Sequence, residues 1–150
     1  MIKADNLRKF HPGVRIKNGS GITLSAVQTA VEKGAEDIGI PVAFYDDQVK
    51  SGGLFNSSVE DCIVMYHPDH ERDYFKFCIR VGRQGSYAFV SVNNFGESKQ
   101  IAKANYAENS KREGGPMLDR LVMTIGRSKQ KLEEEQMYYQ CIFDIFDEIF

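Results

Sequence analysis

The spacing of apolar residues predicts an early helix, then strands, and then a helical C-terminal third. Between residues 27 and 38, apolar or small side chains recur at intervals of three and four, which predicts one buried stripe on a helix over residues 25–38. Ser25 and Gln28 fit a capping box at its start, because this pair satisfies two free backbone N–H groups. Gly39 and Pro41 are typical of helix ends, so we expect the helix to stop there.

Three consecutive segments predict a β-meander over residues 61–93. Residues 62–67 form a continuous apolar run, whereas residues 74–81 and 86–93 alternate between apolar and polar side chains. The glycine-containing link between the last two segments predicts a tight hairpin with residue 81 opposite residue 86. This register sets apolar residues against apolar residues on the buried face, namely Phe75, Phe77 and Ile79 against Val92, Val90 and Ala88.

Glycine-rich stretches predict the loops. Residues 11–23 hold three glycines and a proline, which predicts a loop with at most a short strand around residues 14–16. Residues 41–45 predict a short strand. Residues 46–60 contain a Gly-Gly pair and predict a long loop, of a length that is typical of functional lids or disordered segments.

The last third of the chain predicts helices over residues 97–110 and 117–150, separated by a Gly-Gly-Pro break. The second would span about 50 Å if unbroken, so both one helix and two helices are open alternatives. The order of elements predicts a single α+β domain over residues 1–150. We expect one antiparallel sheet of four or five strands, packed by the helix at 25–38 and by the C-terminal helices.

Composition is that of an ordinary globular protein. The 150 residues are 42% hydrophobic and 27% charged, which excludes a collagen, a coiled-coil rod, a disulfide knot and wholesale disorder. The chain has three cysteines, Cys62, Cys78 and Cys141. Because their number is odd and their spacing is not that of a metal site, we expect reduced thiols. The chain start lacks a signal peptide's apolar core, and no apolar run approaches the ~20 residues that cross a membrane. We therefore expect a cytoplasmic protein without membrane contact.

The formal charge of -2 conceals four blocks of alternating sign. Residues 1–17 carry five basic and one acidic side chains, and residues 18–75 carry three basic and ten acidic ones. Residues 76–131 carry eleven basic and four acidic side chains, and residues 132–150 carry six acidic and none basic. Such blocks are typical of a nucleic-acid surface or an acidic partner-binding tail. The simplest expectation is that opposite blocks meet in the fold and neutralise each other.

Two segments predict a surface for a protein partner. The segment 67–73 has two histidines and three carboxylates between two strands, which is typical of a polar contact loop. The helix end at 132–150 is apolar with only acidic charges, so we expect it to complete the core, to dock on a partner, or to form a homodimer. The predicted protein contacts are His67, Asp69, His70, Glu71, Ile142, Phe146 and Phe150.

The outward face of the predicted hairpin makes nucleic-acid binding the alternative. Aromatic rings interleaved with lysine and arginine on a sheet stack bases and hold phosphates. Residues 85–92 locally resemble the RNP1 strand of RNA-recognition motifs, but the predicted order lacks the helix between the first two strands of that family. The competing expectation is that the C-terminal helix covers this face and buries its rings. The predicted nucleic-acid contacts are Lys76, Arg80, Arg83, Tyr87 and Phe89.

No motif predicts catalysis. The chain lacks the Walker A, dinucleotide-binding glycine, HExxH and GxSxG patterns, so we expect no catalytic residue, no cofactor and no bound metal. A remote alternative is a metal-dependent hydrolase or nuclease that uses His67, His70 and nearby carboxylates. The sequence therefore favours a small cytoplasmic, non-enzymatic protein that binds another protein and regulates or inhibits it.

Overall fold

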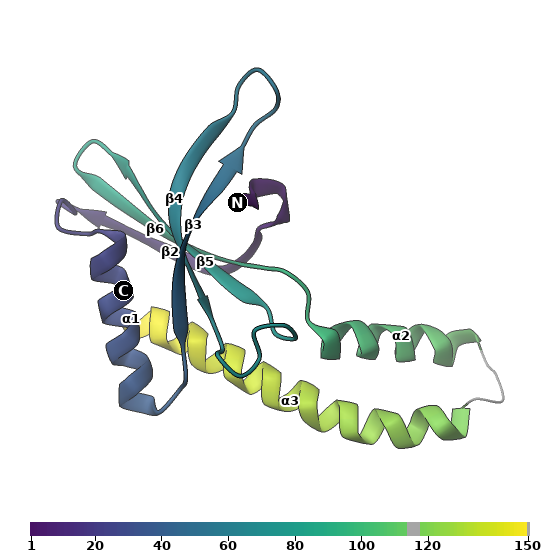
Figure 1. The fold of residues 1–150 in the computed structure, drawn as a ribbon. Coiled ribbons are helices and arrows are strands. Elements are labelled where there is room, and N and C mark those ends of the chain that lie inside the picture. The colour runs from purple at the N-terminus through teal and green to yellow at the C-terminus, as the bar shows by residue number, and fades with distance from the viewer. Residues whose placement is uncertain (114–117, 150) are drawn as a thin grey trace.

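A six-stranded sheet and three α-helices make up the described part of the chain (Figure 1). The computed structural model describes the backbone of residues 1–113 and 118–149, and the side chains of residues 1–106 and 129–149. The elements in chain order are β1 (Ile2–Lys3), the 3-10 turn η1 (Ala4–Asn6), β2 (Arg8–Lys17), α1 (Leu24–Ile38), β3 (Ala43–Ser51), β4 (Ser58–Tyr66), β5 (Lys76–Gln84), β6 (Tyr87–Phe95), α2 (Lys99–Glu113) and α3 (Leu118–Ile149).

The strand order is β1-β3-β4-β5-β6-β2. All neighbours are antiparallel except β1 and β3, which run parallel. The predicted α+β class is confirmed, whereas the described sheet is mixed and has six strands rather than four or five antiparallel ones. The pairing of β2 with β6 brings the start of the chain beside the last strand of the meander.

Helix α1 begins earlier than the predicted capping box. Thr23 is in an extended conformation, and its hydroxyl accepts a hydrogen bond from the Ala26 backbone N–H at 3.1 Å. The predicted box at Ser25 and Gln28 is therefore wrong, and Gln28 instead donates to Glu32 one turn along the helix. The predicted stop is confirmed, because Gly39 has the positive φ of +69° that favours glycine at a helix C-terminus.

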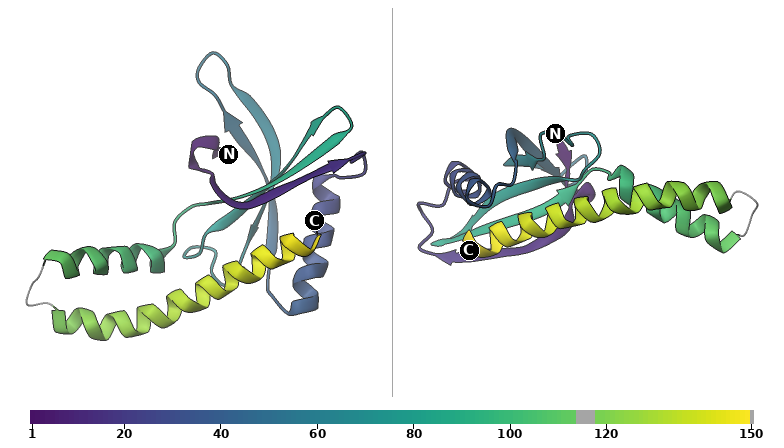
Figure 2. Two further views of the ribbon diagram at one scale, coloured as in Figure 1. Left: turned by 180° about the vertical axis from the view of Figure 1, so that it is seen from behind. Right: turned by 90° about the horizontal axis from the view of Figure 1, so that it is seen from below.

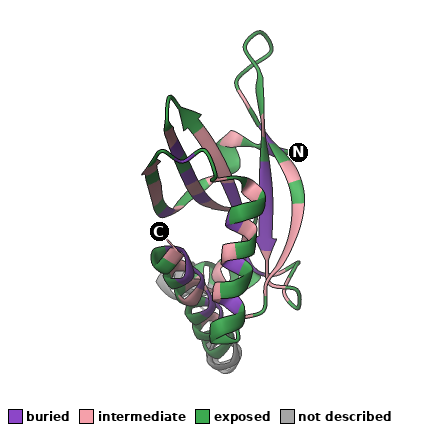
Figure 3. Cartoon of the chain, turned by 90° about the vertical axis from the view of Figure 1, so that its left-hand side faces the viewer, coloured by how far each residue is buried: buried purple, intermediate pink, exposed green. Residues whose placement is uncertain are grey.

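Two segments predicted as loops are long strands. Residues 8–17 form β2 despite Pro12 and Gly13, because the register shifts around these residues and the strand lies at the sheet edge, where proline is tolerated. Residues 46–60 belong mostly to the β3–β4 hairpin, which pairs from Ala43 with Tyr66 down to Ser51 with Ser58. In Figure 1 this hairpin extends beyond the other strands, and its tip is exposed in Figure 3.

The β5–β6 hairpin exists, but its register differs from the prediction by four residues. Val81 pairs with Val90, and the turn consists of Gly85 and Ser86, with Gly85 at the positive φ of +59°. Because a shift of four is even, every side chain keeps the predicted face of the sheet. The predicted inward residues Phe77 and Ile79 are accordingly fully buried.

Helices α1 and α3 cover one sheet face, and the N-terminal segment covers part of the other. Helices α1 and α3 pack on the face formed by inward residues of β4, β5 and β6 (Figures 1 and 2). On the opposite face, Ile2, Ala4 and Leu7 pack against β3, β4 and β5. The second face is therefore shielded at one end only.

Residues 118–149 form one continuous helix, which answers the question that the sequence left open. Its C-terminal part packs in the core, and its N-terminal part extends beyond the sheet beside α2 (Figure 2). Ile142 and Phe146 are fully buried, so the expectation that this helix end completes the core is confirmed, and their predicted role as protein contacts is corrected. Phe150 lies outside the described residues.

Candidate nucleic-acid interface

Strands β6 and β2 leave an open area on the sheet face opposite the helices. Directly opposed residues share a face of the sheet, and the register pairs Phe89 with Arg15 and Tyr87 with Lys17. Phe89 is 40% exposed and Tyr87 is half-buried. The expectation that the C-terminal helix buries these rings is wrong, because α3 packs on the other face, against Val90 and its neighbours. We call this area, formed by the outward residues of β2, β5 and β6, the open face.

Two aromatic rings lie next to each other on the open face. The centroids of Tyr87 and Phe89 are 6.3 Å apart, as expected for residues two positions apart on one strand. The guanidinium carbon of Arg15 lies 5.4 Å from the Tyr87 ring centroid, within the range of a cation–π contact. The arrangement combines apolar ring surface with fixed positive charge.

The sheet is divided into a basic and an acidic half. Strands β2, β5 and β6 carry seven basic residues and no acidic one, whereas β3 and β4 carry four acidic residues and one basic. The division arises because β2 pairs with β6, which joins the basic block at residues 1–17 to the start of the basic block at residues 76–131. Opposite blocks do meet at single ion pairs, Arg80 with Glu60 and Lys76 with Glu71, as expected, but the basic residues of β2 have no acidic neighbour on the paired strand β6.

Two predicted contacts, Lys76 and Arg80, lie on the open face but have partners within the chain. The Lys76 ammonium lies 5.4 Å from the Tyr45 ring centroid and 5.7 Å from that of Tyr66. Arg80 donates to the side chain of Asn93 at 3.0 Å, and its guanidinium lies 3.6 Å from the Glu60 carboxylate. The Arg80 Nε is buried and has no partner among the described residues, which leaves one donor unused.

Arg83 belongs to the other face of the sheet. Its parity along β5 matches that of Phe77 and Ile79, and its guanidinium donates to the backbone oxygens of Gly19 and Ile22. These bonds hold the loop that leads into α1. The prediction that Arg83 contacts nucleic acid together with Tyr87 and Phe89 is therefore corrected.

Sequence reasoning missed the contribution of β2 to the open face. Lys9 pairs with Asn93, and Arg15 and Lys17 pair with the two aromatic residues, so all three share the face of β6 that carries them. All three basic side chains are exposed. The available signal was the alternation of Val14 and Ile16 with these cations, which is a strand pattern with one charged side.

Two cysteines lie on the same side of the sheet, where the N-terminal segment covers it. Cys62 and Cys78 are fully buried on neighbouring strands, and Cys141 is half-buried on α3. A hydrogen bond from Cys78 to Cys62, together with burial, raises the pKa of Cys78 and keeps it a neutral thiol. A buried neutral thiol is a poor nucleophile, so Cys78 acts as packing for the sheet, whereas the same hydrogen bond lowers the pKa of Cys62.

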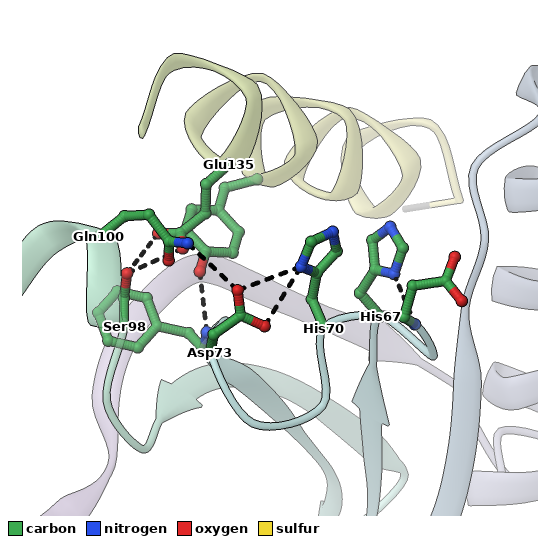
Figure 4. A network of polar contacts seen from close by, with 9 residues as sticks. His67, His70, Asp73, Ser98, Gln100 and Glu135 are labelled. Carbon is green, nitrogen blue, oxygen red and sulfur yellow. Dashed lines mark hydrogen bonds and ion pairs between the residues drawn. The ribbon is translucent and has the colours of Figure 1, made fainter. Parts of the chain in front are cut away.

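The predicted contact loop at residues 67–73 is engaged within the chain (Figure 4). His70 Nδ1 lies 3.2 Å from both carboxylate oxygens of Asp73, and its ring stacks on Tyr74 with centroids 4.0 Å apart. Gln100 on α2 also donates to Asp73 at 3.2 Å. Burial together with the neighbouring His70 lowers the pKa of His67. Asp69 and Glu71 are the predicted contacts of this loop that are exposed.

A buried carboxylate joins the start of α2 to α3 in the same network. Ser98 Oγ donates to both oxygens of Glu135, at 2.9 and 2.6 Å, while it accepts the Ile101 N–H and so caps α2 (Figure 4). Glu135 is fully buried, and burial raises its pKa. No local pattern predicts this contact, because nothing nearby in the sequence distinguishes Glu135 from the two glutamates before it.

The described residues offer no metal site or membrane span. They contain no group of three or more His, Cys, Asp or Glu side chains placed to hold a metal ion. None of the helices in the described ranges is both long enough and apolar enough to cross a membrane. Comparisons with protein-family models, with curated proteins and with solved structures find no match to this chain.

Proposed function

We propose that this chain binds nucleic acid through the open face of β2, β5 and β6. One observation carries the proposal: the outward positions of these strands hold five cations (Lys9, Arg15, Lys17, Lys76 and Arg80) and no acidic residue, beside Tyr87 and Phe89. Three of the cations are exposed at the β2 edge, where a phosphate backbone can reach them without displacing any element of the fold.

Electrostatics supply the free energy of such binding. Each phosphate that is neutralised by a lysine or arginine releases condensed counterions, so affinity falls steeply as salt rises. With three exposed cations, we expect weak binding, in the range of about 10⁻⁴ to 10⁻⁶ M that is typical of nonspecific contacts. Glu60 takes part of the charge of Arg80, so the exposed β2 cations contribute most.

The test is an anisotropy titration of a labelled oligonucleotide at about 50 and 200 mM salt. The double variant Arg15→Ser/Lys17→Ser should bind about tenfold more weakly at low salt than the unmodified chain. The control variant Lys33→Ser/Lys103→Ser makes the same change in net charge at exposed positions on α1 and α2 and should bind normally. Equal losses in both variants would reduce the effect to net charge and contradict a defined face.

A second candidate is the protein-binding role predicted from the sequence, and one observation favours it. Leu54 and Phe55 at the tip of the β3–β4 hairpin are 97% and 98% exposed, in a hairpin that is otherwise acidic. Two adjacent apolar side chains in full contact with water fit an apolar pocket with a basic rim on a partner protein. A regulatory or inhibitory action would follow from occupying that pocket.

A photo-crosslinking amino acid at position 55 tests this candidate. It should give a discrete adduct with one protein in cell extract, and Leu54→Ser should abolish that adduct. The same crosslinker at Tyr106, which is 69% exposed on α2, serves as the control for nonspecific reaction. Identical adducts from positions 55 and 106 would count against a docking site at the hairpin tip.

A further inference from the structure

We infer that the nucleic acid is single-stranded and that successive bases stack on Tyr87 and Phe89 while the backbone follows β2. This inference rests on the proposed function and adds the class of ligand and the way its bases are held. It concerns the ring surfaces and the space around them, whereas the proposed function rests on charge.

The ring spacing matches bases that are not stacked on each other. The two ring centroids are 6.3 Å apart, which is nearly twice the ~3.4 Å rise between stacked bases of a nucleic-acid strand. Bases in a duplex hide both faces in the stack, so they cannot offer a face to either ring. An extended single strand has free base faces and can be stretched to the spacing of alternate residues on a β-strand.

Each ring has a cation directly across the strand pair. Arg15 is opposite Phe89, and Lys17 is opposite Tyr87, so a ring and a cation form a unit that repeats once along the strands. A single strand repeats in the same way, with one base and one phosphate per nucleotide. If the bases lie over β6 and the phosphates lie along the β2 edge, each base meets one ring and each phosphate meets one cation.

The other side of Phe89 is open because its neighbour on β5 is a glycine. Gly82 pairs with Phe89, and a Cβ built at Gly82 would meet only Phe89 atoms, at 4.0 Å. Any larger side chain at this position would stand beside the ring on the open face. Gly82 therefore leaves flat backbone next to an exposed ring, which is space for the edge of a stacked base.

Single-tryptophan fluorescence tests this arrangement directly, because the chain has no tryptophan. The variant Phe89→Trp reports stacking at the open face, and Phe55→Trp at the exposed hairpin tip is the matched control. The probes are an oligothymidylate of about 12 nucleotides, a duplex of equal length, and heparin, which carries charge without bases. Circular dichroism spectra equal to that of the unmodified chain establish that each variant is folded.

Oligothymidylate should quench Phe89→Trp strongly, while heparin and the duplex leave its emission unchanged and no probe alters Phe55→Trp. Binding of oligothymidylate by anisotropy without quenching at position 89, or equal quenching by the duplex, would overturn the inference and leave the proposed function standing. Absence of binding of every probe at low salt would overturn both. The variant Tyr87→Leu/Phe89→Leu adds a second readout: it should lose at least about tenfold in affinity for oligothymidylate and keep its affinity for heparin.

Discussion

The guanidinium of Arg15 lies 5.4 Å from the ring centroid of Tyr87, although the two residues are far apart in the sequence. The contact exists because β2, near the start of the chain, pairs with β6, which is the last strand in the sequence. This pairing brings two basic segments together on one surface. The acidic β3–β4 hairpin lies in the other half of the strand order.

Lys17 and Phe89 should affect nucleic-acid binding in different ways. We expect Lys17→Ser to lower the slope of log affinity against log salt by about 1, because it removes one phosphate contact. Phe89→Leu should lower affinity for a single strand and leave that slope unchanged, because a base contact releases no counterions. Salt titrations of both variants make the comparison, and a change of slope in Phe89→Leu would contradict the assigned roles.

Filling the space at Gly82 should weaken binding without changing any charge. A Cβ at this position meets only atoms of Phe89 at an ordinary contact distance, so Gly82→Val should fold normally in strand β5. We expect its affinity for oligothymidylate to fall about tenfold, as for the loss of one stacked base, with no change for heparin. Urea unfolding provides the control for stability, and unchanged affinity for oligothymidylate would show that no base lies over Gly82.

The buried Glu135 should make stability fall as pH rises. Because burial raises its pKa, the folded chain holds this proton more tightly than the unfolded chain does. The stabilisation is therefore full below the ordinary pKa of a glutamate and is lost as pH rises through the raised pKa. The variant Glu135→Gln keeps an acceptor for Ser98. Between about pH 4 and pH 7, its urea midpoint should therefore fall less than that of the unmodified chain.

Glu134→Gln, at the exposed neighbouring position, is the control for this pH dependence. It should follow the unmodified chain across the same range. If Glu135→Gln also follows the unmodified chain, Glu135 titrates as it does in the unfolded state, and the account of a carboxylate buried against Ser98 fails.

Ile142 should behave as a core residue. Because Ile142 is fully buried on the side of α3 that packs in the core, Ile142→Ala should reduce the free energy of unfolding by about 2–5 kcal/mol. Met137→Ala on the same helix removes a side chain that is 57% exposed and should change stability far less. Denaturant unfolding measures both, and equal small losses would return Ile142 to the surface role predicted from the sequence.

The periodicity of apolar residues predicted the α+β class and the inward side of each strand in the β5–β6 hairpin. It did not predict the register, because Gly82 and Gly85 are both suitable turn residues, and a shift of four residues preserves every face. The observed turn is the two-residue link Gly85-Ser86, with the positive φ at Gly85. The shift moves Tyr87 and Phe89 along the strands away from Arg80, which lies opposite Ser91 instead.

The remaining differences come from contacts between distant segments. Pro12 and Gly13 are typical of loops, and they are accommodated in β2 because the strand lies at an edge. The partner of β2 cannot be read from local pattern, so the basic surface was predicted with Arg83, which lies on the wrong face, and without Arg15 and Lys17. The burial of Glu135 likewise depends on Ser98, which is brought to it by the packing of α2 on α3.

The most direct test of the central claim is a titration of backbone amide NMR signals with oligothymidylate at low salt. We expect shifts confined to residues of β2, β5 and β6, largest at Arg15, Tyr87 and Phe89, with the β3–β4 hairpin unchanged. Shifts centred on the acidic β3–β4 hairpin, or no shifts at all with the probe in large excess, would contradict nucleic-acid binding by the open face.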